Sequence, residues 1–319
     1  MVKMPLDVIS LGESMSELCA TSTGHLREVA GFKLGWGGDT SNFSVAVARL
    51  GRKVGYICRL GDDEFGRSFV ELWAREGVDA SRVIVEKGAF TGVYFISLID
   101  GGEHDFTYYR KDSAASRLSP EDVDEAYVRQ AKVFHSSGIS LAVSQSLREA
   151  VFKAVRVAKE AGGLFSFDPN VRLRLWPIHT ARAVVSYACA QADIVLSSIE
   201  DMKLLYGYDD PEKAAASLRS MGPRTVVVKL GADGCLVSAK DESFRSPGFK
   251  VKVVDTTGAG DAFDAAFIVG MLEGWEYRRI ARFANAVGAL TAIDRGAVAP
   301  IPTRQKTEAF LRSQGFREA

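Results

Sequence analysis

The chain has 319 residues, of which 47% are hydrophobic and 25% are charged, a composition typical of a folded globular protein and unlike that of a disordered or fibrous protein. Lys and Arg (40) balance Asp and Glu (40), so the formal net charge is +0 and no broad basic surface is expected for nucleic acid or an anionic membrane. An anionic ligand must therefore be bound by a few local groups.

Targeting and redox signals favour the cytoplasm. The sequence does not open with a basic and then apolar leader, and no uninterrupted apolar stretch is long enough to span a bilayer. The four cysteines lie in apolar segments without the paired spacing of a metal site, and the four histidines show no ligand pattern. We therefore expect a cytoplasmic protein with free, buried thiols.

Short β-branched runs alternate along the chain with longer amphipathic stretches. Strands are predicted at residues 7–11, 54–60, 164–168, 194–197, 225–230 and 235–238, and helices at 40–50, 65–76, 146–161, 261–273 and 278–293. This alternation predicts an α/β fold with a mostly parallel sheet covered by helices on both faces. Ligands of such sheets bind outside the carboxyl ends of the strands.

Two segments, residues 14–36 and 90–110, depart from this alternation. In the second, β-rich runs at 93–99 and 107–110 flank the sequence Asp-Gly-Gly at 100–102, which predicts a hairpin by its turn chemistry. No internal repeat or low-complexity linker separates either segment from the rest, so we expect a single domain over residues 1–319.

The most informative segment is 254–267, VDTTGAGDAFDAAF, where a turn of small residues leads into an apolar helix. Gly258, Ala259 and Gly260 leave their backbone N–H groups unshielded, and the helix dipole adds to their attraction for a phosphoryl group. A carboxylate at Asp261 can take the proton from an attacking hydroxyl. For an arbitrary Gly-x-Gly-Asp sequence, the alternative is a tight turn followed by a first-turn acid.

The run DTTGAGDAF at 255–263 resembles the C-terminal signature of the ribokinase-like (PfkB) carbohydrate kinases. The sequence GGDTSN at 37–42, followed by AVARLG at 46–51, is similar to the N-terminal sugar-binding motif of the same family. The resemblance extends over nearly the whole chain. It implies the three-layer ribokinase-like fold, in which residues 14–36 and 90–110 form a small β lid, and it implies ATP as phosphate donor.

The sugar end of the site is expected at the N-terminal motif. Gly38 lets the backbone approach a polyol, while Asp39 and Asn42 offer acceptor and donor groups to hydroxyls. The alternative is a helix start capped by Asp39 or Thr40. Because the Asp261 motif occurs in the same chain, we favour sugar binding by Asp39 and Asn42 over the helix-cap alternative.

Segments at 106–110 (FTYYR), 135–140 (HSSGIS) and 167–172 (FDPNVR) resemble those of family members that act on 2-keto-3-deoxygluconate. Arginines suit such a sugar acid, because a guanidinium group can bind a carboxylate through two hydrogen bonds. The resemblance implies substrate contacts from Tyr94, Tyr108, Arg110 and Arg172. The alternatives are an exposed strand carrying a stacked arginine, and a neutral sugar such as fructose or ribose.

The nucleotide end is also implied by the resemblance. Gly231 and Gly234 follow a predicted strand and permit close backbone approach, and Asn285 would lie near the adenine. Glu200 and Asp201 match the segment that organises Mg²⁺ through water, although both also suit the first turn of a helix. The full set implied for the nucleotide is Asn170, Ser198, Lys229, Gly231, Gly234, Gly258, Gly260 and Asn285.

Several features are left open by the sequence. Asp255 and Thr257 correspond to a potassium site in some relatives, no protein ligands for a metal are identified, and residues 295–297 read Arg-Gly-Ala where relatives often have Arg-Gly-Asp. Asp294 is a candidate substitute for that missing acid. A homo-oligomer formed through the lid is expected.

These features together predict a kinase that transfers the ATP γ-phosphate to the terminal hydroxyl of 2-keto-3-deoxygluconate. The alternatives are a kinase of fructose or ribose and, more remotely, a sugar-acid sensor without catalytic activity.

Overall fold

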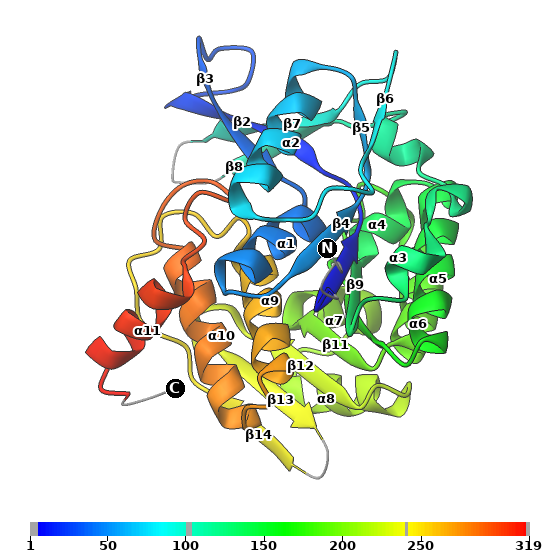
Figure 1. The fold of residues 1–319 in the computed structure, drawn as a ribbon. Helices are drawn as coiled ribbons and strands as arrows, with labels where there is room; N and C mark the ends of the chain where they lie inside the picture. Colours follow the sequence, from blue (N-terminus) through cyan, green and yellow to red (C-terminus); the bar gives the residue numbers. More distant parts are fainter. Residues whose placement is uncertain (1–5, 100–103, 240–241, 317–319) are drawn as a thin grey trace.

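The computed structural model describes residues 6–99, 104–239 and 242–316, and its centre is a sheet of eight strands in the order β14-β13-β12-β11-β10-β9-β1-β4 (Figure 1). Neighbours from β4 to β12 pair in parallel, and β13 and β14 add an antiparallel edge. The strands are β1 (Val8–Leu11), β4 (Val54–Ile57), β9 (Val133–Ser137), β10 (Leu164–Asp168), β11 (Ile194–Ser198), β12 (Thr225–Lys229), β13 (Cys235–Ala239) and β14 (Glu242–Ser246).

Helices cover both faces of this sheet, as the alternating sequence predicts. One face carries α1 (Asp39–Arg49), α2 (Glu64–Glu76), α9 (Ala259–Leu272), α10 (Tyr277–Thr291) and α11 (Arg304–Ser313). The other carries α3 (Glu125–Val128), α4 (Gly138–Val143), α5 (Gln145–Glu160), α6 (Ile178–Gln191), α7 (Ile199–Tyr206) and α8 (Pro211–Ser220). Successive side chains of β12 enter opposite cores, Val226 and Val228 on one face and Val227 on the other.

The predicted strand at 54–60 is divided in the structure. Ile57 is paired with Leu11, the last residue of β1, so the parallel ladder ends there. The chain then forms β5 (Arg59–Gly61), which pairs with β6 (Ile84–Glu86) in a separate two-stranded sheet. Arg59 binds the carboxylates of Asp122 and Glu86, and these ion pairs stabilise β5 outside the main sheet.

A second, four-stranded sheet lies above the carboxyl ends of the central strands (Figure 1). Its order is β3-β2-β7-β8, with β2 (Met15–Thr23), β3 (Phe32–Gly37), β7 (Gly92–Leu98) and β8 (His104–Tyr109). β7 and β8 are antiparallel, which confirms the predicted hairpin, while its predicted turn at 100–102 lies outside the described residues. This lid sheet has the position that the resemblance implies.

Candidate active site

A cleft of about 1470 Å³ opens between the central sheet and the lid sheet. It lies at the carboxyl ends of the parallel strands, where the last residues of β10, β11 and β12 are Asp168, Ser198 and Lys229. All the predicted site residues line this one cleft: Gly38, Asp39, Asn42, Tyr94, Tyr108, Arg110, Asn170, Arg172, Ser198, Lys229, Gly231, Gly234, Gly258, Ala259, Gly260, Asp261 and Asn285. The fold thus brings both predicted ends of the site together.

The glycine turn before α9 has the shape of an anion cradle. Gly258 has φ 77° and caps the helix, and a Cβ atom there would lie 2.4 Å from the carbonyl oxygen of Ala297. At Gly260 the situation differs, because a Cβ atom would project into open space with Lys229 Nζ as its nearest neighbour at 3.7 Å. The first-turn N–H groups of α9 therefore face the cleft unobstructed, as phosphate binding requires.

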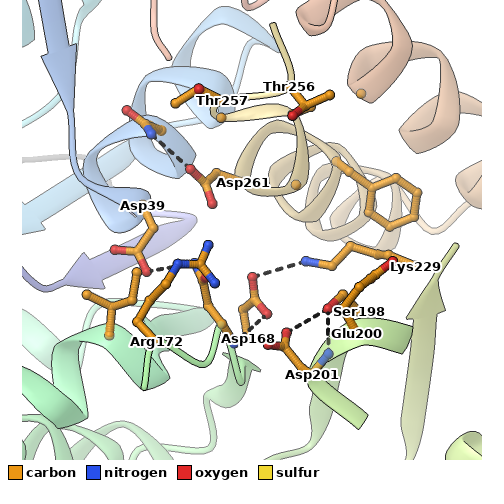
Figure 2. A pocket seen from close by; sticks show the side chains of 18 of the residues that line it. Asp39, Asp168, Arg172, Ser198, Glu200, Asp201, Lys229, Thr256, Thr257 and Asp261 are labelled. Atoms are coloured by element: carbon orange, nitrogen blue, oxygen red, sulfur yellow. Dashed lines mark hydrogen bonds and ion pairs between the residues drawn. The ribbon is translucent and has the colours of Figure 1, made fainter. Parts of the chain in front are cut away.

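Asp261 lies in this first turn and points into the cleft (Figure 2). Asn42 from α1 donates a hydrogen bond of 2.8 Å from Nδ2 to its Oδ2 oxygen, which fixes the direction of the carboxylate. Burial, helped by the nearby charges of Asp39 and Asp168, raises the pKa of Asp261 to about 7. A carboxylate with such a pKa is suited to accept a proton near neutral pH.

Three buried charges meet below the glycine turn. Lys229 Nζ lies 3.0 Å from Asp168 Oδ2 and 2.9 Å from Asp264 Oδ1. Burial alone would lower the pKa of Lys229, but the two carboxylates outweigh it and raise the pKa, so the ammonium stays charged. Asp264 was missed by the sequence reasoning, although its position three residues after Asp261 places both on one side of α9.

The sugar end contains an arginine with a buried partner. Arg110, 9% exposed, is ion-paired through its Nη2 with Glu13, which also accepts a hydrogen bond of 3.2 Å from Ser113. Within the described residues, Arg110 Nε and Asn42 Oδ1 are buried without a hydrogen-bond partner. Both side chains line the cleft, and each keeps one polar atom that the described residues do not satisfy. Glu13 was also missed, and its only signal is an acid just beyond the first strand.

The other predicted sugar contacts differ in their surroundings. Tyr94 on β7 donates a hydrogen bond of 2.6 Å to Glu17 on β2, so its hydroxyl ties two lid strands together. Tyr108 is half-buried beside it, with ring centroids 5.8 Å apart. Arg172 is exposed and donates to the carbonyl of Val171, and Figure 2 shows its guanidinium group directed toward the centre of the cleft.

Asp39 connects the two ends. Its Oδ2 accepts a hydrogen bond of 3.1 Å from Asn170 Nδ2, and its Oδ1 accepts one from the N–H of Thr40. Asn170 has φ 35°, a conformation that asparagine tolerates better than most residues. Burial raises the pKa of Asp39, and the charge of Asp168 adds to the shift.

On the nucleotide side, Ser198 caps α7 and donates a hydrogen bond of 2.8 Å to Asp201, whose other oxygen accepts from the Val171 N–H. Asp201 is therefore held by the protein, whereas Glu200 is exposed in the cleft (Figure 2). No cluster of three or more His, Cys, Asp or Glu side chains suited to a metal occurs among the residues that the structure describes.

Two further glycines and one amide shape the nucleotide side. Gly231 has φ 58°, and a Cβ there would meet nothing within 4 Å. At Gly234, with φ 96°, a Cβ would lie 2.1 Å from the carbonyl oxygen of Ser246. Asn285 Nδ2 donates to that same carbonyl at 3.1 Å and to the carbonyl of Pro247 at 3.2 Å, so it orders the cleft wall after β14.

The loop beyond α10 does not place an acid in the cleft, contrary to the expectation for Asp294. Asp294 is exposed and lies outside the cleft, so the structure contradicts its role as a substitute for the missing acid. Ala297 is buried, with its carbonyl under Gly258. Asp255 binds this loop through the N–H of Gly296 at 3.0 Å and accepts a hydrogen bond of 2.6 Å from Thr257 Oγ1.

Comparison with known proteins agrees with this geometry. Residues 6–304 match the pattern of the pfkB family carbohydrate kinases. The chain belongs to this family. It is 38% identical over 312 residues to the 2-dehydro-3-deoxygluconokinase of Thermoproteus tenax, covering 97% of this chain and 95% of that protein.

This kinase is also similar to proteins named for other sugars. It is also 38% identical, over 317 residues, to the probable fructokinase-2 of Arabidopsis thaliana, covering 96% of each protein. The crystal structure of a putative ribokinase II from E. coli in complex with ATP and Mg²⁺ superposes with a TM-score of 0.90 at 32% identity, covering 97% of this chain and 99% of that one. Family membership therefore establishes an ATP-dependent sugar kinase and leaves the sugar to be determined.

Proposed function

We propose that this kinase transfers the γ-phosphate of ATP to the terminal hydroxyl of 2-keto-3-deoxygluconate, giving 2-keto-3-deoxy-6-phosphogluconate. The carrying observation is the pair of arginines in the cleft: Arg110 has a buried Nε donor without a partner among the described residues, and Arg172 faces the same space. Two guanidinium groups suit a substrate with a carboxylate. The identity with the Thermoproteus tenax enzyme supports the same substrate.

The residues divide the reaction between them. Gly38, Asp39 and Asn42 hold the sugar hydroxyls, with the free Oδ1 of Asn42 accepting one hydrogen bond. Asp261 takes the proton from the terminal hydroxyl as its oxygen forms a bond to the γ-phosphorus, while the bond from that phosphorus to the β,γ-bridging oxygen breaks and releases ADP. The N–H groups at Gly260 and beyond stabilise the developing negative charge.

We propose Mg²⁺ as the metal that accompanies ATP. Glu200, exposed at the edge of the cleft, fits a Mg²⁺ ion that keeps most of its water ligands, since this ion is often bound by one or two carboxylates and substrate phosphates. Bound Mg²⁺ would neutralise part of the triphosphate charge. We expect phosphorylation to be lost in excess chelator and restored by Mg²⁺. A comparison of K⁺ with Na⁺ in the same assay tests whether the segment with Asp255 and Thr257 forms a potassium site.

A neutral-sugar kinase is the second candidate, because Glu13 already pairs with Arg110 and offsets its charge. An ATP-consumption screen over ribose, fructose, gluconate and 2-keto-3-deoxygluconate separates the candidates. The highest kcat/KM on 2-keto-3-deoxygluconate is expected, whereas a preference for fructose would reject the proposed substrate. Turnover on none of the sugars would favour the sensor, against which the intact Asp261 and glycine turn argue.

Arg110→Ala tests the carboxylate contact directly. A charge-assisted hydrogen bond is worth roughly 1.5–3 kcal/mol, so KM for 2-keto-3-deoxygluconate should rise by about 10- to 100-fold. Fructose, which has no carboxylate, is the matched control and should be affected much less. Equal losses on both sugars would show that Arg110 supports the lid rather than reading the substrate charge.

We further propose a cytoplasmic homodimer joined through the outer face of the lid sheet. Phe32, Leu34 and Tyr109 are 37%, 49% and 58% exposed there, and the Phe95 ring lies between those of Phe32 and Tyr109 at 5.2 and 5.7 Å. A second copy of the chain would cover this apolar face. The four free cysteines agree with a reducing compartment, and no helix in the described ranges combines the length and apolarity needed to cross a membrane.

A further inference from the structure

Lys229 occupies a position between the glycine turn and two buried acids. Its Nζ is 2.9 and 3.0 Å from the two oxygens of Asp264 and 3.0 Å from Asp168 Oδ2. A Cβ on Gly260 would lie only 3.7 Å from the same Nζ, so the ammonium stands beside the phosphate cradle. Figure 2 shows the contact between Lys229 and Asp168 as a dashed line.

Asp264 is costly to bury where it lies. It is 1% exposed, and its neighbours in α9 from Ala262 to Val269 are otherwise apolar and buried. It caps no helix, and both of its carboxylate oxygens accept hydrogen bonds from Lys229. Burial raises the pKa of Asp264, and the charge of Lys229 acts against this shift. An apolar side chain would fill this space at lower free energy, because a buried carboxylate loses its hydration. Its presence therefore calls for a role connected with Lys229.

We propose that Asp264 is a positioning residue for phosphoryl transfer, which holds the Lys229 ammonium against the glycine turn. This inference rests on the function proposed above. An ammonium group has three N–H donors. If Asp168 and Asp264 each accept one, the third is left for a phosphoryl oxygen at Gly260. Lys229 keeps its proton throughout, while the hydroxyl proton goes to Asp261.

The same arrangement influences Asp261. The charge of Lys229 lowers the pKa of Asp261, whereas the charge of Asp168 raises it. Asp264, bonded to Lys229, adds a further carboxylate to this group. The titratable groups around Lys229 and Asp261 come from five elements, and they are Asp39 on α1, His135 on β9, Asp168 on β10, Lys229 on β12, and Asp261 and Asp264 on α9.

The test compares Asp264→Asn, Lys229→Met and the double variant. Asp264→Asn keeps the size of the side chain but removes its charge, and we expect kcat to fall about tenfold with the sugar KM within about twofold. The acid limb of its pH–rate profile should move to lower pH, and that of Lys229→Met to higher pH. Because Asp264 acts through Lys229, the double variant should be no slower than Lys229→Met alone.

Asp63→Asn serves as the control for general destabilisation. Asp63 caps α2 and binds Thr91, and it does not line the cleft. It should lower Tm without moving the pH–rate profile. If Asp264→Asn behaves in the same way, or if its loss of kcat persists in full in the Lys229→Met background, the positioning role is refuted.

Calorimetry with ATP and Mg²⁺ keeps this inference separate from the choice of sugar. Lys229→Met and, to a lesser degree, Asp264→Asn should weaken nucleotide binding whichever sugar is the substrate. A wild type that phosphorylates none of the sugars would reject the proposed function. Unchanged nucleotide affinity in both variants would reject the placement of Lys229 at the phosphate.

Discussion

Asp261 shows how one carboxylate serves two opposing demands. As the proposed proton acceptor it must lie in the cleft beside the glycine turn, and burial there raises its pKa to about 7. The same burial makes its charged form costly to the folded protein. At this single residue, catalytic competence and stability are therefore expected to conflict.

Asp261→Asn separates these two demands. The amide keeps an oxygen toward Asn42 but cannot accept the hydroxyl proton, so kcat should fall by about 10²–10⁴-fold while ATP binding persists. Steady-state kinetics and calorimetry measure both quantities. A variant with near wild-type kcat would end the assignment of Asp261 as the base.

The stability of the same variant should depend on pH. The folded-state pKa of Asp261, about 7, is above the unfolded value of about 3.9, so its contribution to stability is fully present below pH 4 and lost as pH rises through 7. Asp261→Asn should therefore have a higher Tm than the wild type at pH 8, with a much smaller difference near pH 4. A lower Tm at pH 8 would contradict the cost assigned to the buried charge.

At the scale of elements, the start of α9 combines two glycines with different duties. Gly258 supplies a positive φ and a close approach to the carbonyl of Ala297, which are requirements of the fold. Gly260 already lies within the helix, where a Cβ would be tolerated by the backbone but would project toward Lys229 and the cradle. We therefore expect Gly258 to serve folding and Gly260 to serve ligand binding.

Replacing each glycine by alanine tests this division. Gly258→Ala should destabilise the protein by more than 1 kcal/mol, since both its φ and its clash with backbone are unfavourable. Gly260→Ala should leave Tm unchanged or slightly higher, because alanine favours the helix, yet raise KM for ATP or lower kcat by about tenfold or more. Thermal denaturation measures Tm, and steady-state kinetics measure KM and kcat. If the two variants change stability and kinetics equally, the two glycines do not have separate roles.

The elements also show what could be predicted from the sequence. The turn at 258–261 and the hairpin at 90–110 depend on local chemistry, and the structure has α9 and the β7–β8 pairing where they were expected. The end of β4 at Ile57 depends on the length of its neighbour β1, which no local pattern in 54–60 reveals. Helices α3, α4, α6, α8 and α11 and the central strand β9 were missed. Among α6, α8 and α11, α6 has the weakest separation of polar and apolar faces.

For the site, the sequence predicted which residues share the cleft but not how they pair. Lys229 and Asp264 are 35 residues apart, and Arg110 and Glu13 are 97 apart, so these ion pairs exist only after the sheet and lid have formed. The prediction assigned Arg110 to the substrate carboxylate and did not include its buried acidic partner, Glu13. The ion pairs of this cleft therefore depend on how distant segments pack in the folded chain, which the spacing of residues within a motif does not reveal.

At the scale of the whole molecule, the lid sheet has two apolar faces with different partners. Tyr94 and Ile96 are buried on the inner face, next to Tyr108 and the cleft. Phe95, between them in sequence, must point the other way, where it meets Phe32 and Tyr109. A sheet face that carries two exposed aromatic rings and an exposed leucine is unusual for a monomer in water.

The proposed dimer follows from this outer face. Leu34→Glu combined with Tyr109→Glu would place charges in the interface, and we expect the protein to change from dimer to monomer in light scattering coupled to size-exclusion chromatography. Ser243→Glu, on the distant edge strand β14, is a surface control that should leave the dimer intact. Both charge substitutions lie on solvent-exposed positions, so the monomer should remain folded, and its sugar KM should rise if the partner steadies the lid. A wild type that is monomeric at micromolar concentration, or a double variant that stays dimeric, would show that the lid face is not the dimer interface.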